Sequence, residues 1–257
     1  MLGVKLHGII LLFLWMTPSF SQSTFIIDCG GIIRGDTTRR DLALVFTGGD
    51  FADGGPHIRR ILLEKNIKAG FFFTGDFYRD PAKKRIILDL IKDDHYLGPH
   101  SDKHLLYAPW EKRDSSLVSE KQFKNDLLAN YSEMEKFGLK PAPPLFFIPP
   151  YEWYNVSHVR WAQDLSVVLF NFTPGTSSNA DYTTPELVNY RSSQAIYDKI
   201  LSYERTDPRG MNGVILLIHI GTDPRRTDKF YLKLANLIDV LSSRGYRFLR
   251  IDQMLSR

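Results

Sequence analysis

The chain has 257 residues and a formal net charge of +4, from 33 basic and 29 acidic side chains that are mixed along the sequence. Because no long basic run is present, a nucleic-acid partner is not expected. The single cysteine excludes an intramolecular disulfide, and a hydrophobic share of 43% is enough for a substantial core.

Residues 1–21 have the features of a signal peptide. Lys5 supplies a positive charge, the run from Gly8 to Met16 is apolar, and Ser19-Phe20-Ser21 is a small-x-small cleavage site. The apolar run is too short to span a bilayer. We therefore expect cleavage before Gln22 and a periplasmic or secreted mature protein without a stable membrane span. A retained signal anchor is the alternative.

Beyond this segment, apolar runs typical of strands alternate with amphipathic stretches typical of helices. Residues 22–41 are expected to be an irregular N-terminal segment, and 42–257 a single domain, because no Pro/Gly-rich linker divides them. The predicted strands are 42–47, 69–73, 145–148, 167–170, 214–218 and 246–250, and the predicted helices are 56–65, 81–92, 119–137, 159–165, 193–203 and 229–244. This order predicts an α/β fold with a parallel sheet, and about seven strand–helix units favour a closed (β/α) barrel.

His100 and His104 are spaced so that one helical turn would bring their imidazoles together, close enough to share a cation. Neutral imidazole is a common ligand of zinc and related metals. Two solvated helix histidines are the plainer interpretation of the same spacing.

Other polar side chains follow predicted strands. Asp50 and Asp53 come after the first strand, Glu152 after the third, and His219 at the end of the fifth. The carboxyl ends of barrel strands lie on one face, so these side chains can meet the histidine pair in one mouth. Two histidines and a carboxylate form a facial set for a divalent metal. His219 suits a general acid or base there, although a buried core histidine is the alternative.

Four segments resemble motifs of the polysaccharide deacetylases, carbohydrate esterase family 4. His100-Ser101-Asp102-Lys103-His104 resembles the family's His-Ser/Thr-x-x-His metal motif. Residues 67–75 resemble its Ala-Thr-Phe-Phe strand, Pro149-Pro150-Tyr151 its Arg-x-Pro-Tyr-Gly segment, and Leu217-Ile218-His219 its Leu-x-His motif. The matches run in the family's order over about residues 42–250.

The resemblance implies a distorted seven-stranded (β/α) barrel and metal-dependent removal of N- or O-acetyl groups from a polysaccharide or oligosaccharide. It implies one divalent ion, zinc foremost, held by His100, His104 and a carboxylate, which activates the attacking water. The Tyr151 backbone N–H would help to hold the oxyanion, and His219 would protonate the departing amine or alcohol.

The first motif departs from the family. Its Thr-Phe-Asp-Asp-Gly supplies a base and a metal ligand side by side, whereas the segment Phe46-Thr47-Gly48-Gly49-Asp50 holds no adjacent pair. We expect Asp50 to be the ligand rather than Asp53, because the register for Asp53 runs the strand through two glycines.

If Asp50 holds the metal, the base must come from elsewhere. The family's Arg that orients the base is lost with it, since its position falls at Ile148. We expect Glu152, which stands where the family has Gly, to be the base; a solvated rim glutamate is the alternative. A catalytically impaired carbohydrate-binding protein on the same barrel, or another metallohydrolase such as an amidase, also remains open.

Overall fold

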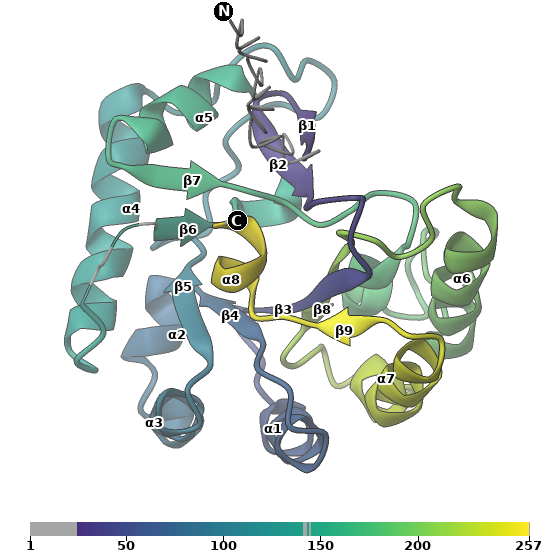
Figure 1. Cartoon of the computed structure of the whole chain (residues 1–257). Helices are drawn as coiled ribbons and strands as arrows, with labels where there is room; N and C mark the ends of the chain where they lie inside the picture. The colour runs from purple at the N-terminus through teal and green to yellow at the C-terminus, as the bar shows by residue number, and fades with distance from the viewer. Residues whose placement is uncertain (1–24, 141–142, 144, 257) are drawn as a thin grey trace, which may run out of the picture.

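The structure is a computed structural model that describes residues 25–140, 143 and 145–256. Its main sheet holds parallel strands in the order β5-β4-β3-β8, with β9 paired to the start of β3 (Figure 1). These strands are β3 (Asp41–Gly48), β4 (Gly70–Phe73), β5 (Tyr96–Pro99), β8 (Ile215–His219) and β9 (Arg247–Phe248). The predicted α/β fold with a parallel sheet is confirmed. The predicted signal peptide lies outside the described residues.

Two smaller sheets complete the strands. β6 (Leu145–Phe147) and β7 (Val167–Leu169) pair in parallel with each other. β1 (Ile26–Asp28) and β2 (Gly31–Arg34) form an antiparallel hairpin within the segment expected to be irregular. Strands of three and four residues are too short to give a clear alternation in the sequence, so the hairpin was not predicted.

The main sheet does not close into the expected seven-stranded barrel. In the described part of the chain no backbone ladder joins β5 to β6, and side chains make the links instead. The Phe146 N–H donates to the Tyr96 hydroxyl at 3.0 Å, and His100 Nδ1 donates to the Ile148 carbonyl at 2.9 Å. Because these bonds depend on tertiary packing, strand periodicity does not reveal them.

The edge of β8 that is not paired with β3 is also bonded to side chains instead of to another strand. The backbone N–H groups of alternate β8 residues donate to side-chain oxygens of the segment between β7 and the next helix. The pairs are Ile215 with Thr173 Oγ1, Leu217 with Ser178 Oγ, and His219 with Asp181 Oδ2. This edge therefore carries a chain of polar side chains up to the carboxyl end of β8.

Helices lie around the sheets (Figure 1). They are α1 (Gly55–Glu64), α2 (Gly75–Arg79), α3 (Lys84–Lys92), α4 (Glu120–Glu135), α5 (Val156–Gln163), α6 (Ser193–Thr206), α7 (Leu234–Ser243) and α8 (Ile251–Leu255), with 3-10 turns η1 (Pro81–Lys83), η2 (Pro150–Glu152), η3 (Ser178–Tyr182) and η4 (Phe230–Lys233). The short elements α2, α8, η2 and η3 were not predicted. Within the described ranges, no helix has the length and apolar character that crossing a bilayer demands.

Alternate residues of β3 face two hydrophobic clusters. The outer cluster, toward the helices, includes Leu44 and Phe46, whereas the inner cluster includes Ala43 and Val45. Helix α8 contributes Ile251, Met254 and Leu255 to the inner cluster and lies near the centre of Figure 1. It therefore covers the inner cluster near the start of β3.

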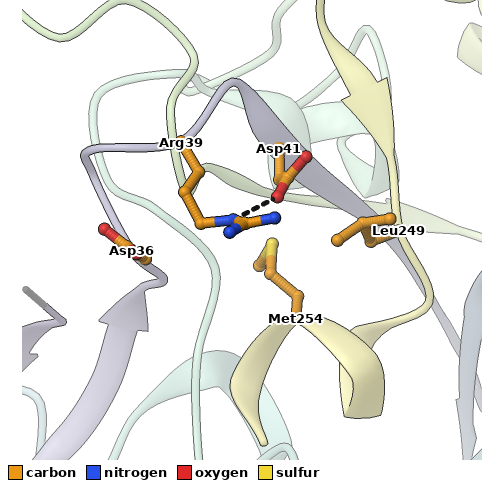
Figure 2. A pocket seen from close by; sticks show the side chains of 5 residues that line it. All are labelled: Asp36, Arg39, Asp41, Leu249 and Met254. Carbon is orange, nitrogen blue, oxygen red and sulfur yellow. Dashed lines mark hydrogen bonds and ion pairs between the residues drawn. The ribbon is translucent and has the colours of Figure 1, made fainter. Parts of the chain in front are cut away.

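A small pocket marks this covered end of the sheet (Figure 2). It measures about 10 Å³, lies beside the 2.9 Å ion pair of Arg39 and Asp41, and is bordered by Leu249 and Met254. That volume holds at most about one water molecule. A site for a larger ligand must lie elsewhere.

Candidate active site

A cavity of about 920 Å³ lies at the carboxyl ends of the strands. This volume is within the range of small-molecule and cofactor sites. All six residues proposed from the sequence line it: Asp50, His100, His104, Tyr151, Glu152 and His219. Strand exits distant in the sequence are thus brought together, as expected for parallel strands.

The histidine pair is close, but not for the predicted reason. The imidazole centroids of His100 and His104 are 5.0 Å apart. The residues follow β5 in a loop rather than a helical turn, and Ser101 and His104 have positive φ angles of 71° and 53°. The expected helical turn is wrong because side chains of α4 impose another backbone path on this loop.

Two α4 residues hold the histidine turn, residues 100–104. The Asn130 side-chain oxygen accepts the His100 N–H at 2.9 Å. The Asp126 carboxylate accepts the Ser101 hydroxyl at 2.6 Å and the N–H groups of Asp102 and Lys103 at 3.1 and 3.0 Å. Positive φ at residues other than glycine costs on the order of 1–3 kcal/mol and persists only where surrounding contacts fix it.

Both imidazoles of the turn are neutral at physiological pH. Burial, together with the neighbouring His104, lowers the pKa of His100 well below its ordinary value. Burial and the charge of His219 lower the pKa of His104 to about 4. Because His100 Nδ1 donates to a carbonyl, its Nε2 carries a free lone pair. This is the form in which histidine binds metals, with the other ring nitrogen fixed by a backbone oxygen.

The imidazole pair fits a divalent metal, but a complete donor set is not assembled. Among the residues that the structure describes, no three His, Cys, Asp or Glu side chains are gathered closely enough to hold an ion. Asp50 is exposed on the cavity wall, and its charge raises the pKa of His104 against the effect of burial. Asp50 is therefore a carboxylate of the cavity wall whose charge acts on His104.

Asp53 lies outside the cavity wall. Its carboxylate accepts the Thr222 N–H at 2.9 Å and the Tyr231 hydroxyl at 2.8 Å, and it pairs with Lys229 at 3.2 Å. These contacts anchor the loop after β3 to the segment after β8. The geometry thus favours Asp50 over Asp53 as a site residue.

His219 is held by Asp181. Its Nδ1 lies 2.6 Å from Asp181 Oδ1, and its backbone N–H donates to Oδ2 of the same carboxylate, which is 1% exposed. Burial alone would lower the pKa of His219, but Asp181, with a smaller contribution from Glu152, raises it above the ordinary value. The Asp181 carboxylate thus favours a proton on this imidazole, which lines the cavity.

Glu152 lies on the His219 side of the cavity. It sits in the tight η2 turn, where Tyr151 and Glu152 both have positive φ, and its carboxyl bonds to the Asn179 side chain. Burial raises the pKa of Glu152 to about 7, although His219 opposes this shift. A carboxyl with this pKa is partly ionised at neutral pH, as a general base requires.

Aromatic side chains form the rim. The ring centroids of Tyr151 and His104 are 4.4 Å apart with the rings tilted, those of Trp110 and Tyr151 are 5.9 Å apart, and those of Tyr182 and His219 are 5.6 Å apart. Trp110, Tyr151 and Tyr182 are all about half exposed. Trp153 packs against Trp110 and does not line the cavity. The exposed rings offer apolar faces on which sugar rings can pack.

Sequence reasoning missed Asp181, Asn179 and Thr47. Asp181 and Asn179 lie in the η3 turn, between the predicted strand 167–170 and the predicted helix 193–203, where the sequence predicts no regular element. The sequence contains one indication that Asp181 has a role, namely that it is the sole charged residue between Thr173 and Thr184. Thr47 was seen only as the end of a strand, although it lines the cavity.

The family model for polysaccharide deacetylase matches residues 34–169, more than half of the chain. This chain belongs to the polysaccharide deacetylase family. It is a divergent member of carbohydrate esterase family 4, without the adjacent aspartates of the first motif. A curated peptidoglycan-N-acetylglucosamine deacetylase from Bacillus cereus is 24% identical over 216 residues, which cover 83% of this chain and 87% of that protein.

Solved structures share the fold. A carbohydrate esterase family 4 pseudoenzyme from Bacillus anthracis has a TM-score of 0.68 at 18% identity, over 89% of this chain and 69% of that chain. A family 4 acetyl xylan esterase from Clostridium thermocellum, solved with a cobalt ion, has a TM-score of 0.63 at 20% identity, over 83% of this chain and 89% of that chain. The fold thus occurs in both active and inactive relatives.

Proposed function

We propose that this protein hydrolyses acetyl groups from a polysaccharide with the help of one divalent metal ion. One observation carries the proposal: the cavity that holds the neutral pair His100 and His104 also holds His219, whose Nδ1 is bonded to the buried Asp181 carboxylate at 2.6 Å. A binding site needs only hydrogen-bond donors and acceptors, but a buried carboxylate that orients a cavity imidazole and raises its pKa suits proton transfer to a leaving group.

His100 and His104 would hold the ion, with Asp50 as the carboxylate best placed to join them. When bound, such an ion polarises a carbonyl and lowers the pKa of a water molecule. Zinc is the ion that we expect first, because two imidazoles and a carboxylate suit it.

The remaining steps belong to the chain's own side chains. Glu152, with a pKa of about 7, accepts a proton from the attacking water. His219 donates its proton to the departing nitrogen or oxygen, while Asp181 fixes the ring and its tautomer. We also propose the Tyr151 N–H, in the tight η2 turn, as a donor to the oxyanion.

For the substrate, we propose an N-acetylglucosamine polymer such as peptidoglycan. The half-exposed rings of Trp110, Tyr151 and Tyr182 suit packing against sugar rings, and the curated relatives are named for that substrate. A polymer of the cell wall agrees with a periplasmic or secreted location, which we propose from the predicted signal peptide.

Carbohydrate binding without turnover is the second candidate. Thr47 and Gly48 end β3 and Gly49 follows it, so no carboxylate lies at the strand exit itself. Within the described ranges, no three His, Cys, Asp or Glu side chains lie close enough together to hold a metal ion. If the ion does not bind, the cavity retains its sugar-binding rim and its hydrogen-bonding groups but lacks metal assistance for the attack of water.

The test measures acetate release from peptidoglycan, chitooligosaccharides and acetylated xylan, with zinc, with cobalt and with EDTA. Metal-dependent release supports the deacetylase, whereas saturable glycan binding without release under any condition supports the binding protein. Asp50→Asn and Asp53→Asn form a matched pair. The proposal requires that Asp50→Asn loses bound metal and that Asp53→Asn keeps it, because Asp53 is bonded outside the cavity.

A further inference from the structure

The cavity contains one buried hydroxyl whose hydrogen bonding is not satisfied within the protein. Thr47 is 1% exposed, and its Oγ1 has no partner. Several other buried polar atoms in the described residues also lack one, but none belongs to a residue that lines the cavity. A buried hydroxyl without a partner costs stability, so its presence where a ligand would bind suggests that the ligand supplies the partner.

The strand alternation explains why Thr47 has this position. A Cβ at the next residue, Gly48, would meet Ile220 Cγ2 at 2.7 Å and Phe77 at 2.9 Å, both in the outer cluster. Thr47 points to the opposite side, above Val45 of the inner cluster. The neighbouring hydroxyl of Thr74 is already used, because it accepts the Phe77 N–H at 3.1 Å.

On the β8 side of the sheet, the neighbour of Thr47 is His219. The two residues are paired in the parallel ladder of β3 and β8, and both line the cavity. His219 uses Nδ1 to bond Asp181, and in its protonated form the ring only donates hydrogen bonds. Thr47 Oγ1 can accept, so beside the proton donor there is an acceptor for an N–H group.

We propose that Thr47 accepts a hydrogen bond from the amide N–H of a 2-acetamido sugar, and that the site thereby selects N-acetyl over O-acetyl groups. The inference rests on the proposed function in one respect, namely that acetylated sugars bind in this cavity. An acetamido nitrogen carries an N–H that must be paired when buried, whereas an ester oxygen carries none. Selection arises because only the acetamido group offers an N–H to the Thr47 oxygen, whereas an ester oxygen can only accept from the Thr47 O–H and leaves the lone pairs of the hydroxyl unused.

The experiment compares Thr47→Val, which replaces the hydroxyl by a methyl group, with Thr47→Ser, which keeps it. The probes are tetra-N-acetylchitotetraose and O-acetylated xylotetraose, with affinities measured calorimetrically on EDTA-treated protein. We expect the wild type to prefer the N-acetyl ligand. Thr47→Val should weaken this ligand about tenfold and the O-acetyl ligand less than twofold, and Thr47→Ser should retain the preference.

Stability supplies an independent readout. Removal of an unpaired buried hydroxyl should leave the melting temperature of Thr47→Val equal to or above that of the wild type. Lower selectivity without lower stability supports the proposal. Equal effects of Thr47→Val on both ligands, or no effect on either, would overturn it. Acetate release with zinc is scored separately, so a failure of turnover rejects the deacetylase without deciding the selectivity.

Discussion

The histidine turn and the loop after β3 both reach the cavity, but they are anchored differently. The turn donates hydrogen bonds to Asp126 and Asn130 of α4, which hold its backbone in positive-φ conformations. The loop after β3 is tied through Asp53, which bonds outside the cavity and leaves Asp50 exposed on the wall. The nitrogen donors are therefore preorganised, whereas the carboxylate that would complete them is not.

This comparison predicts that metal binding depends first on the turn. The double variant His100→Ala/His104→Ala should lose all bound metal and all acetate release while it remains folded, because both nitrogen donors are removed. Elemental analysis with circular dichroism measures this. His57→Ala is the control, since His57 does not line the cavity. Unchanged metal content in the double variant would contradict the assignment.

The next largest effect is expected at the acid. His219→Ala should lower turnover by roughly 10²–10⁴-fold without loss of metal. In Asp181→Asn the group that raises the pKa of His219 is neutralised, so the alkaline limb of the pH profile should move to lower pH. The profile of kcat/KM against pH measures this shift. Loss of metal in His219→Ala would make His219 a ligand and refute its role as the acid.

Glu152→Gln tests the proposed base, which lies in the η2 turn, outside both compared regions. Because the pKa of Glu152 is about 7, wild-type turnover should rise with pH through that value, and the variant should lose this limb together with most turnover. Metal content should stay the same. Full activity in the variant would leave Glu152 as a rim residue without a catalytic role.

The same variant has a stability signature. Glu152 binds its proton more tightly in the folded than in the unfolded chain, so wild-type stability should fall as pH rises from about 4.5 to about 7. Glu152→Gln should remove roughly 1–3 kcal/mol of this pH dependence. Denaturant unfolding at several pH values gives the slope, and equal slopes for both proteins would place the carboxyl in water.

The sequence predicted the positions of most parallel strands and the residues of the cavity better than it predicted how the strands pair and how the residues are held. Strand runs such as 42–47 and 214–218 are continuous and apolar, and parallel strand exits meet on one face, so Asp50, Glu152 and His219 could be placed together. Asp181 and Asp126 could not be assigned, because each acts on a residue 38 or 23–25 positions away through contacts that only the fold creates.

The smallest effect tests the anchor of the histidine turn directly. Asp126 accepts three hydrogen bonds at 2.6–3.1 Å from the turn and is 8% exposed. Asp126→Asn preserves the size and shape of the side chain, but it replaces one accepting oxygen by an NH₂ group that would face a hydrogen-bond donor of the turn. The free energy of unfolding should therefore fall by about 1–3 kcal/mol. Asp239→Asn, which removes an exposed partner of Lys65, is the matched control and should change it by less than about 0.5 kcal/mol.

If the turn positions the metal donors, Asp126→Asn should also weaken zinc binding by about 10–100-fold at a temperature where the variant is fully folded, because partners behind metal ligands have effects of that size. Zinc titration against a competing chelator measures this. A loss of stability with unchanged zinc affinity would show that α4 supports the fold but not the site. A loss of affinity in Asp126→Asn, combined with unchanged affinity in Asp53→Asn, would show that the two loops differ in function as they differ in anchoring.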